Sequence, residues 1–509
     1  MMPASVSFLE AGDAGGSLLV WALLLPLIGL LVVLLAGGRH ARNITLGLLL
    51  AGLALAAGIA ANIWQSGYAL TYILGGWLPP LGIALRADGL SAAMLTSTAI
   101  VILAIALYAP RQFRVPPGSS ETRVSLVFWA LLLAVWAALI AIFLGGDLFN
   151  LYVALELITF GAVPLVYLDG RAATFVAALR YLLFALLGSV LYLLGVALLY
   201  GNYGTLDIQL LAAQVQAGPA LWTAAALMTA GLLAKTALFP LHLWLPPAHA
   251  GAPPAASALL SALVVKASFF LIVRIWFDLM PGLPPPSASQ ILGVLGAGAI
   301  LIGGVLALQQ ARLKLLIAYS TVAQIGYLFL MFPLAAGFTL SDSELPLTGG
   351  MFQAISHAFA KAAMFMAAGL IAEAVGHDRI ADLRGIGRAL PVTVFAFGLG
   401  ALSLIGVPPS GGFLAKWFLL ISAVMTAQWW WAVVVLLGGL LAGGYMFRVL
   451  APALAPAETP LALKTSVSRF RECVVLALAI CSLLLGLFPQ KPIELLQVGY
   501  PKIEEVTPE

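Results

Sequence analysis

Residues 232–270 read LLAKTALFPLHLWLPPAHAGAPPAASALLSALVVKASFF. Lys235 lies within an apolar run, and Pro240 follows five residues later. Proline has no backbone N–H and cannot donate to the carbonyl of Thr236, so we expect the helix to end just after Lys235. Such a break is tolerated at membrane depth only where it is buried in protein or lines a watery cavity. The stretch therefore predicts a half-helix and a loop inside a membrane protein.

The rest of the chain is equally apolar. Of the 509 residues, 62% are hydrophobic and only 9% are charged, against roughly 25% charged in soluble globular proteins. Runs of about 20 apolar residues indicate transmembrane helices. The chain holds fourteen such runs, at 17–38, 43–63, 88–109, 124–145, 147–168, 172–200, 220–239, 255–276, 289–310, 313–335, 349–374, 391–426 (interrupted), 428–449 and 472–489. We predict an all-α, polytopic membrane protein with about fourteen transmembrane helices and no cleavable signal peptide.

The basic residues alternate between the two sides of this topology. Four of the 24 Lys and Arg lie inside the spans, four lie on one side (Arg86, Arg274, Lys491, Lys502), and sixteen lie on the other: Arg39, Arg42, Arg111, Arg114, Arg123, Arg171, Arg180, Arg312, Lys314, Arg379, Arg384, Arg388, Arg448, Lys464, Arg469 and Arg471. Inner loops carry the excess of basic residues, so both termini are expected outside. The polar, Gly- and Pro-broken stretch 68–88 predicts an external hairpin.

Four lysines and one glutamate lie within the spans: Lys235, Lys266, Lys361, Lys416 and Glu156. Each charge at the centre of a bilayer costs ~2.5–3.5 kcal/mol, so such residues are functional by default. The alternative is that they only hold helices together. Four positive charges and one negative charge are not sustainable in a low dielectric, so some lysines must spend time neutral. A lysine that titrates reversibly can carry a proton.

A second break falls in residues 391–426, where Pro408 and Pro409 precede Lys416. Corresponding broken helices point to an internal repeat. We expect helices 4–8 and 9–13 to form two five-helix repeats with helices 7 and 12 broken, inverted because five is odd. The chain then divides into 1–123, 124–276, 289–449 and 450–509. Lys235 ends its half-helix, where the helix dipole favours positive charge, whereas Lys416 lies near an N-terminal end, where the dipole disfavours it.

The histidines leave two interpretations open. His357 and Lys361 are four residues apart and share a helix face, so His357 is either a relay or a packed, hydrogen-bonded residue. His242 and His249 lie between helices 7 and 8, at the expected inner mouth, as relays or as loop residues. The two cysteines form no metal or disulfide motif, and no cofactor or metal site is expected.

Five segments resemble the antiporter-like subunits shared by Mrp-type cation/proton antiporters and respiratory complex I. They are GDLFNLYVALELITFG, the stretch 232–270, RLKLLIAYSTVAQIGYLFL, ISHAFAKAAMFMAAG and GVPPSGGFLAKWFLL. The resemblance implies a central polar axis that carries protons. Its members would be Glu156, Lys235, Lys266, His357, Lys361 and Lys416.

Within this superfamily, DLFNLY and AQIGY are most similar to the D-type member of the Mrp antiporters. The complex I relatives more often have His in place of Gln324, and their M-type member usually has Glu in place of Lys416. The resemblance implies an ion-transporter subunit rather than an enzyme, in the inner (plasma) membrane of a bacterium. Its partners would be other antiporter subunits, membrane lipid, H⁺ and a monovalent cation, with Na⁺ expected, and no nucleic acid. The alternative is a proton-pumping subunit of a complex I-like or hydrogenase-type redox complex.

Overall fold

The computed structural model describes residues 15–113, 123–282, 284–337, 344–457 and 463–499. The long helices are α1 Ser17–Ala36, α2 Gly38–Ser66, α3 Gly89–Tyr108, α4 Arg123–Leu144, α5 Leu148–Val166, α6 Ala172–Tyr203, α8 Pro219–Thr236, α12 Pro286–Gln309, α13 Leu313–Phe329, α15 Glu344–Val375, α17 Pro391–Ile405, α18 Gly411–Met425, α19 Trp429–Leu454 and α20 Arg469–Leu487. The shorter elements are β1 Leu70–Ile73, η2 Leu74–Gly76, β2 Ala84–Ala87, η3 Ala109–Arg111, α7 Ile208–Ala212, α9 Leu245–Gly251, α10 Pro254–Leu259, η4 Leu260–Val264, α11 Val265–Val273, η5 Arg274–Leu279, α14 Met331–Ala335, η6 Ile380–Asp382, α16 Ile386–Ala389 and α21 Gln490–Gln497.

The number of spans agrees with the sequence. Among the described residues, twelve helical segments are long and apolar enough to cross a membrane. The other two predicted spans are α8, which is 18 residues long, and the interrupted pair α17 and α18, of 15 residues each. The protein is therefore an all-α, polytopic membrane protein, as predicted. The division of its helices into two repeats, at 124–276 and 289–449, stays a prediction.

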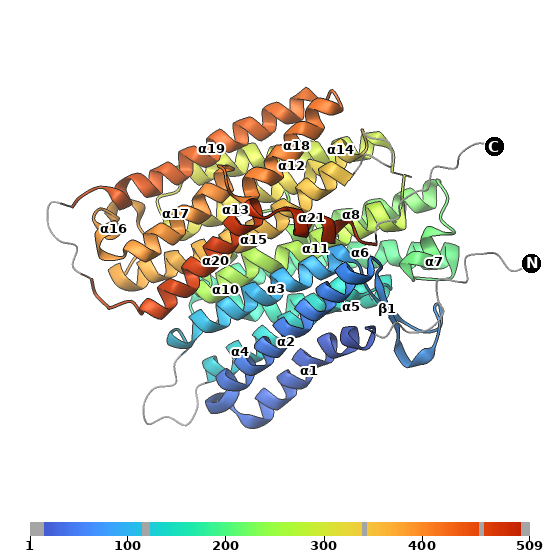
Figure 1. The fold of residues 1–509 in the computed structure, drawn as a ribbon, viewed down its shortest axis with the longest axis horizontal. Helices are drawn as coiled ribbons and strands as arrows, with labels where there is room; N and C mark the ends of the chain where they lie inside the picture. Colours follow the sequence, from blue (N-terminus) through green and yellow to red (C-terminus); the bar gives the residue numbers. More distant parts are fainter. Residues whose placement is uncertain (1–14, 114–122, 283, 338–343, 458–462, 500–509) are drawn as a thin grey trace, which may run out of the picture.

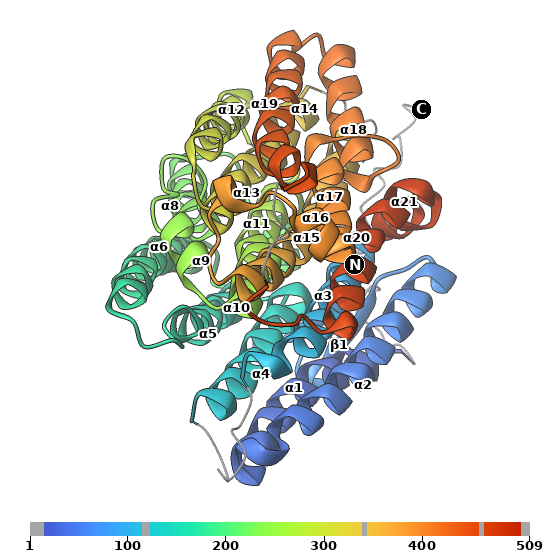
Figure 2. The same ribbon diagram turned by 90° about the vertical axis from the view of Figure 1, so that its left-hand side faces the viewer.

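The helices lie side by side along the long axis of the molecule, with α1 and α2 at one edge and α12 and α19 at the other (Figures 1 and 2). The centre is formed by α15 and by the continuous segment Pro254–Leu279, whose apolar window is entirely buried. By contrast, α1 and α2 expose large apolar side chains such as Leu35, Leu31 and Leu50. A surface of this composition is stable against lipid or against another membrane subunit, so the outer helices face the membrane interior.

Both predicted helix breaks are present. Helix α8 ends at Thr236, and Ala237 takes a left-handed conformation with φ 60°. The Trp244 indole donates to the carbonyl of Ala234 at 2.9 Å and satisfies one of the acceptors that the break frees. In the second break α17 ends at Ile405, and Ser410 caps α18 by accepting from the N–H of Phe413 at 3.2 Å.

The central segment Pro254–Leu279 contains two π-helical turns, η4 and η5. A π turn widens the helix by one residue and leaves local backbone acceptors without their usual partners. Lys266 is the second residue after η4, and its amino group donates to the carbonyl of Ser261 within that turn. The turn therefore supplies an acceptor for a buried cation.

The predicted hairpin is present as an antiparallel pair of strands, β1 and β2, in which Leu70 pairs with Ala87. Helix α21 returns to this end of the bundle, where the N–H of Gly89 donates to the carbonyl of Val498 at 2.9 Å. The start of α1 and helix α21 thus lie at the same end of the bundle (Figure 1). The chain between them must therefore cross the membrane an even number of times. We call this the hairpin end. The opposite end, with α9, α16 and the first turns of α2, α4 and α20, is called the basic end (Figure 2).

An ion pair ties the hairpin end together. Arg274 donates to both carboxylate oxygens of Asp88, at 2.5 and 2.6 Å, and also contacts Asp278 at 2.6 Å. Asp88 in addition accepts from the N–H of Ser91 at 2.9 Å and so caps α3. Burial raises the pKa of the Asp88 carboxyl, but the Arg274 charge and these hydrogen bonds outweigh it and hold that pKa below its usual range.

We expect Asp88→Asn to destabilise the protein, because it leaves a buried guanidinium with one carboxylate fewer. Removing one partner of a buried ion pair costs ~3–5 kcal/mol. Folding lowers the pKa of Asp88, so the ionised carboxylate stabilises the folded protein above about pH 4. This stabilisation is lost as the pH falls through the pKa that Asp88 has in the folded protein. The apparent melting temperature of the purified protein should therefore fall in Asp88→Asn at pH 7, and the difference from wild type should narrow below pH 4. Asp382→Asn, at an exposed carboxylate, is the matched control, and equal melting of all three proteins at pH 7 would contradict the prediction.

Candidate functional site

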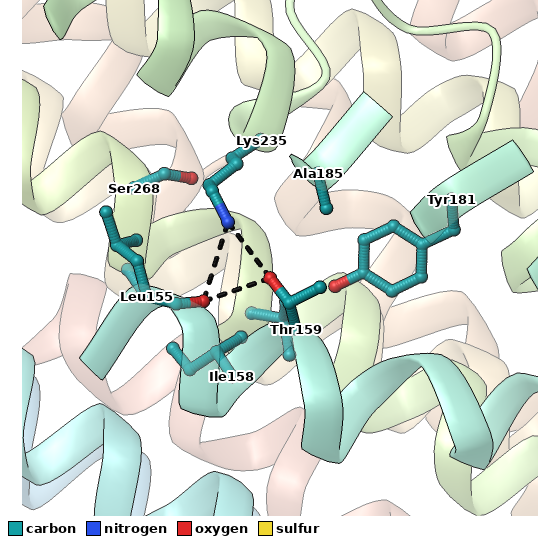
Figure 3. A pocket seen from close by; sticks show the side chains of 9 residues that line it. Leu155, Ile158, Thr159, Tyr181, Ala185, Lys235 and Ser268 are labelled. Carbon is teal, nitrogen blue, oxygen red and sulfur yellow. Dashed lines mark hydrogen bonds between the residues drawn. The ribbon is translucent and has the colours of Figure 1, made fainter. Parts of the chain in front are cut away.

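Glu156 and Lys235 approach each other between α5 and the broken end of α8. The Lys235 Nζ lies 3.6 Å from Glu156 Oε1, and both side chains are largely buried. The same amino group donates to Thr159 Oγ1 at 2.9 Å and reaches the Leu155 carbonyl at 3.5 Å (Figure 3). A carboxylate, a hydroxyl and a carbonyl therefore surround one cation.

A small cavity adjoins Lys235, lined in part by Thr159, Tyr181 and Ser268 (Figure 3). Its volume is about 10 Å³, room for about one water molecule. A polar contact beyond 3.5 Å, as between Lys235 and Glu156, is the kind that a water bridges well. The site can thus hold the chain of donors and acceptors that proton transfer needs.

Hydroxyl groups lead from this pair towards the centre of the bundle. Thr236 Oγ1 contacts Ser268 Oγ at 3.0 Å and so joins the end of α8 to α11. Within η4, Ser261 Oγ contacts Thr321 Oγ1 of α13 at 2.9 Å. Because a hydroxyl both donates and accepts, each contact can pass a proton in either direction. Lys266, fully buried, lies between the two contacts in sequence.

Lys361 is also fully buried, in the middle of α15. Its amino group donates to the carbonyl of Ile317 at 2.9 Å and to Ser320 Oγ at 2.5 Å, both in α13. His357 lies one turn earlier on α15, within the range of electrostatic interaction with Lys361, Lys266 and Lys416. Neither ring nitrogen of His357 has a hydrogen-bond partner within the part of the chain that the structure describes. An imidazole in this state can exchange a proton with ordered water or with a neighbouring group.

Lys416 overturns one expectation from the sequence. Its position near the start of α18 predicted an unfavourable helix dipole. Its amino group instead turns back to the end of α17 and donates to the carbonyls of Leu404 at 2.6 Å and Ile405 at 3.0 Å. It also lies 4.3 Å from the centre of the Tyr327 ring. The dipole of α17 and the ring therefore both stabilise the cation, so the amino group of Lys416, like that of Lys235, lies near a helix C-terminus.

A pair of glutamines connects Lys416 to α15. The Leu404 carbonyl that accepts from Lys416 also accepts from Gln324 Nε2 at 3.0 Å. Gln353 of α15 in turn donates to Gln324 Oε1 at 2.8 Å. Amides of this kind cannot titrate at neutral pH, so they fix the geometry around Lys416 without adding charge.

His242 and His249 are both buried, and whether they relay protons stays a prediction. His242 packs 5.6 Å from the Phe239 ring in the break after α8. His249 lies in α9 between the rings of Trp244 and Phe365, at 6.1 and 6.0 Å.

One buried cation, Lys314, was not predicted from the sequence. Its place two residues after Arg312 predicts an inner-loop residue. The structure buries it at the start of α13, where its amino group donates to the carbonyl of Ala252, and it lies close enough to His249 for its charge to act on that ring. The signal that could have found it is its place in RLKLLIAYS, where Leu313 precedes it and the apolar residues Leu315 to Ala318 follow it.

Among the described residues, Lys235 is the one lysine of the buried row with a carboxylate within 4 Å. Carbonyls, hydroxyls and one aromatic ring contact the others. The same residues contain no group of three His, Cys, Asp or Glu that could hold a metal ion. A row of weakly compensated buried lysines suits charge transfer better than structural pairing, since a structural pair needs a full counter-charge.

A polytopic bundle with broken helices and a buried row of ionisable side chains defines an antiporter-like, proton-translocating membrane subunit. The chain belongs to the NADH:quinone oxidoreductase/Mrp antiporter transmembrane family, whose model matches residues 145–442. It is 36% identical over 418 residues to the N subunit of the NADH-quinone oxidoreductase of Desulforudis audaxviator, covering 81% of each chain. It is 29% identical over 416 residues to the D subunit of the Na⁺/H⁺ antiporter of Alkalihalophilus pseudofirmus, covering 80% of this chain and 81% of the relative.

A chain of the Mrp complex from a Dietzia species has the same fold. It superposes with a TM-score of 0.84 at 26% identity, covering 95% of this chain and 96% of that one. The similarity thus extends over nearly the whole chain.

Proposed function

We propose that this chain is the proton-translocating subunit of a multisubunit antiporter that exchanges protons for a monovalent cation, with Na⁺ as the expected cation. It would lie in the plasma membrane of a bacterium with its basic end inside. The proposed proton path consists of Glu156, Lys235, Lys266, His357, Lys361 and Lys416. The observation that carries the proposal is the imbalance of four buried lysines with one carboxylate.

This imbalance gives the path its mechanism. A proton on one buried lysine raises the free energy of a proton on the next, because like charges repel strongly at low dielectric. Arrival of a proton at Lys235 would therefore favour its onward transfer towards Lys266 and then Lys361. Glu156 reverses the effect locally, since its negative charge stabilises a proton on Lys235. The Glu156 carboxylate thus favours protonation of Lys235, the lysine at one end of the proposed path.

The antiporter assignment is supported by the similarity to the Na⁺/H⁺ antiporter relative and to the Mrp complex, together with Gln324 and Lys416. A second candidate is a proton-pumping subunit of a redox-driven complex, favoured by the 36% identity to the NADH-quinone oxidoreductase relative. The two differ in their partners rather than in this chain's chemistry. Purifying the tagged chain from its native membrane and identifying the co-purifying subunits tests the choice. Iron–sulfur or quinone-reducing subunits in stoichiometric amount would overturn the antiporter assignment.

We expect the isolated chain not to exchange sodium for protons. Sodium prefers several oxygen ligands, whereas the proposed path offers one carboxylate among four lysines, and each protonated lysine repels a cation. In vesicles that contain this full chain alone, a sodium gradient should produce no proton movement above that of protein-free vesicles. The complete assembly in the same lipid is the positive control, and a pH-sensitive dye gives the readout. Robust exchange by the lone chain would contradict the prediction, while the proton path would still be testable by mutation.

A further inference from the structure

The basic end of the bundle contains a cavity that the proton path does not use. Its volume is about 480 Å³, and it lies between the first turns of α2, the end of α3 with η3, and the start of α20. Its lining includes Arg42, Arg111, Arg471, Tyr108 and Phe470. Three arginines from three segments far apart in the sequence therefore meet at one point, and Figure 2 views this end of the molecule.

Arg471 is the anchor of this group. Its side chain is only 3% exposed, and its guanidinium carbon lies 4.3 Å from the centre of the Tyr108 ring. One nitrogen, Nη1, donates to Glu373 at 2.6 Å. The other two, Nε and Nη2, have no hydrogen-bond partner in the described part of the chain. A buried guanidinium with two unused donors has capacity for an anion with two oxygens, since its fork matches phosphate geometry.

The charge balance agrees with an anionic ligand. Glu373 also lies 3.2 Å from Arg111 Nε, so one carboxylate faces two arginines. Arg42 is exposed and adds a third positive charge. The three arginines and Glu373 together carry a net charge of two positive units. A phosphate diester, with one negative charge, can therefore bind without making the site negative. Ser468 precedes α20 at the same place, and the first N–H groups of that helix add to the attraction for an anion.

The surroundings favour a lipid over a soluble ion. Phe470 lines the cavity with its side chain 58% exposed, and Leu107 adds a second apolar side chain. The cavity opens where membrane-crossing helices begin and end, which is the depth of phospholipid headgroups. Basic pockets between transmembrane helices bind anionic headgroups in this way.

We propose that this cavity binds the phosphate of one anionic phospholipid, with the guanidiniums of Arg471, Arg111 and Arg42 on the phosphate and Phe470 beside the glycerol and upper acyl chain. The bound lipid would hold α2, α3 and α20 together at the basic end.

Native mass spectrometry of the full chain in a neutral detergent tests this proposal. The probes are dioleoyl phosphatidylglycerol and dioleoyl phosphatidylcholine, which have the same acyl chains and differ in net charge. Wild type should retain one phosphatidylglycerol with an affinity at least about tenfold above that for phosphatidylcholine, because each basic residue adds appreciably to the attraction. The double variant Arg42→Gln/Arg111→Gln should lose that preference.

The matched control is Arg384→Gln/Arg388→Gln, which removes two exposed arginines from the same end but away from the cavity. It should keep the preference. Arg471→Lys keeps the charge and loses the fork, so it should weaken phosphatidylglycerol binding while the chain stays folded. Equal phosphatidylglycerol affinity in wild type and in the Arg42→Gln/Arg111→Gln variant would overturn the proposal. Displacement by millimolar inorganic phosphate would assign the site to a free ion and overturn the lipid assignment.

The intact assembly provides a second test. Phenylglyoxal modifies accessible arginines, and peptide mass spectrometry reads its reaction with Arg111. Delipidation should increase this reaction, and added phosphatidylglycerol, but not phosphatidylcholine, should suppress it. Protection of Arg111 that persists after complete delipidation would show that another protein covers the cavity, and it would overturn the proposal.

Discussion

Replacing Glu156 with glutamine is expected to lower proton transport about 100-fold while the chain still inserts at normal abundance. The substitution keeps the shape of the side chain and removes its charge, so the Lys235 ammonium is left with neutral acceptors alone, among them Thr159 and the Leu155 carbonyl. Removing one partner of a buried ion pair costs ~3 kcal/mol or more. If this cost falls on the protonated form of Lys235, the equilibrium population of that form decreases roughly 100-fold.

Transport in vesicles, followed with a pH-sensitive dye and normalised to the amount of chain, measures this effect. Glu344→Gln is the matched control, because Glu344 is exposed at the start of α15, where it accepts a hydrogen bond from Gln497 at 2.9 Å. It should transport at the wild-type rate. Wild-type transport by Glu156→Gln at normal abundance would remove Glu156 from the path.

Replacing Lys416 with alanine is the second change with a large expected effect. It removes the one titratable group of the proposed path at the break between α17 and α18, and it leaves the carbonyls of Leu404 and Ile405 without their Lys416 donor. Transport should fall by about 100-fold, as for loss of an obligatory proton carrier. Lys416→Met, which keeps most of the volume, should be equally inactive and separates loss of the proton site from loss of packing.

Lys416→Glu should keep part of the transport, because a carboxyl can also bind and release a proton and, when protonated, can donate to the Leu404 carbonyl. Lys464→Ala, at an exposed lysine of the basic end, is the control and should be fully active. Activity of the alanine and methionine variants at the wild-type rate would show that protons do not pass through Lys416.

The sequence predicted the parts of the fold that depend on local chemistry. The break after Lys235 follows from the missing N–H of Pro240, and the burial of the lysines follows from the apolar runs that contain them. The ion pair of Glu156 with Lys235 could be expected because a lone carboxylate at that depth is costly. Each of these statements needs only the residue and its neighbours in the chain.

The parts that the sequence did not predict depend on how distant segments return to one another. Lys416 reaches the carbonyls at the end of α17 because the chain folds back between the two half-helices, so its helix alone gives the wrong dipole. The π turn before Lys266 has no composition that distinguishes it from an α-helix. Lys314 stands beside Arg312, and only the position of the Ala252 carbonyl shows that it is buried.

The acceptors at Lys416 give the second half of the molecule a property that the first half lacks. Carbonyl oxygens cannot take up a proton at any physiological pH, so the counter-charge around Lys416 is constant and this position has two states, loaded and empty. At Lys235 the neighbouring carboxylate can itself accept the proton, so one proton has two resting places there. On the proposed proton path, a proton at Lys235 would therefore be able to move to Glu156 and back without leaving the pair, whereas Lys416 would only gain or lose its proton. When the proton concentration changes on one side of the membrane, the Glu156–Lys235 pair would buffer the change and Lys416 would pass it on.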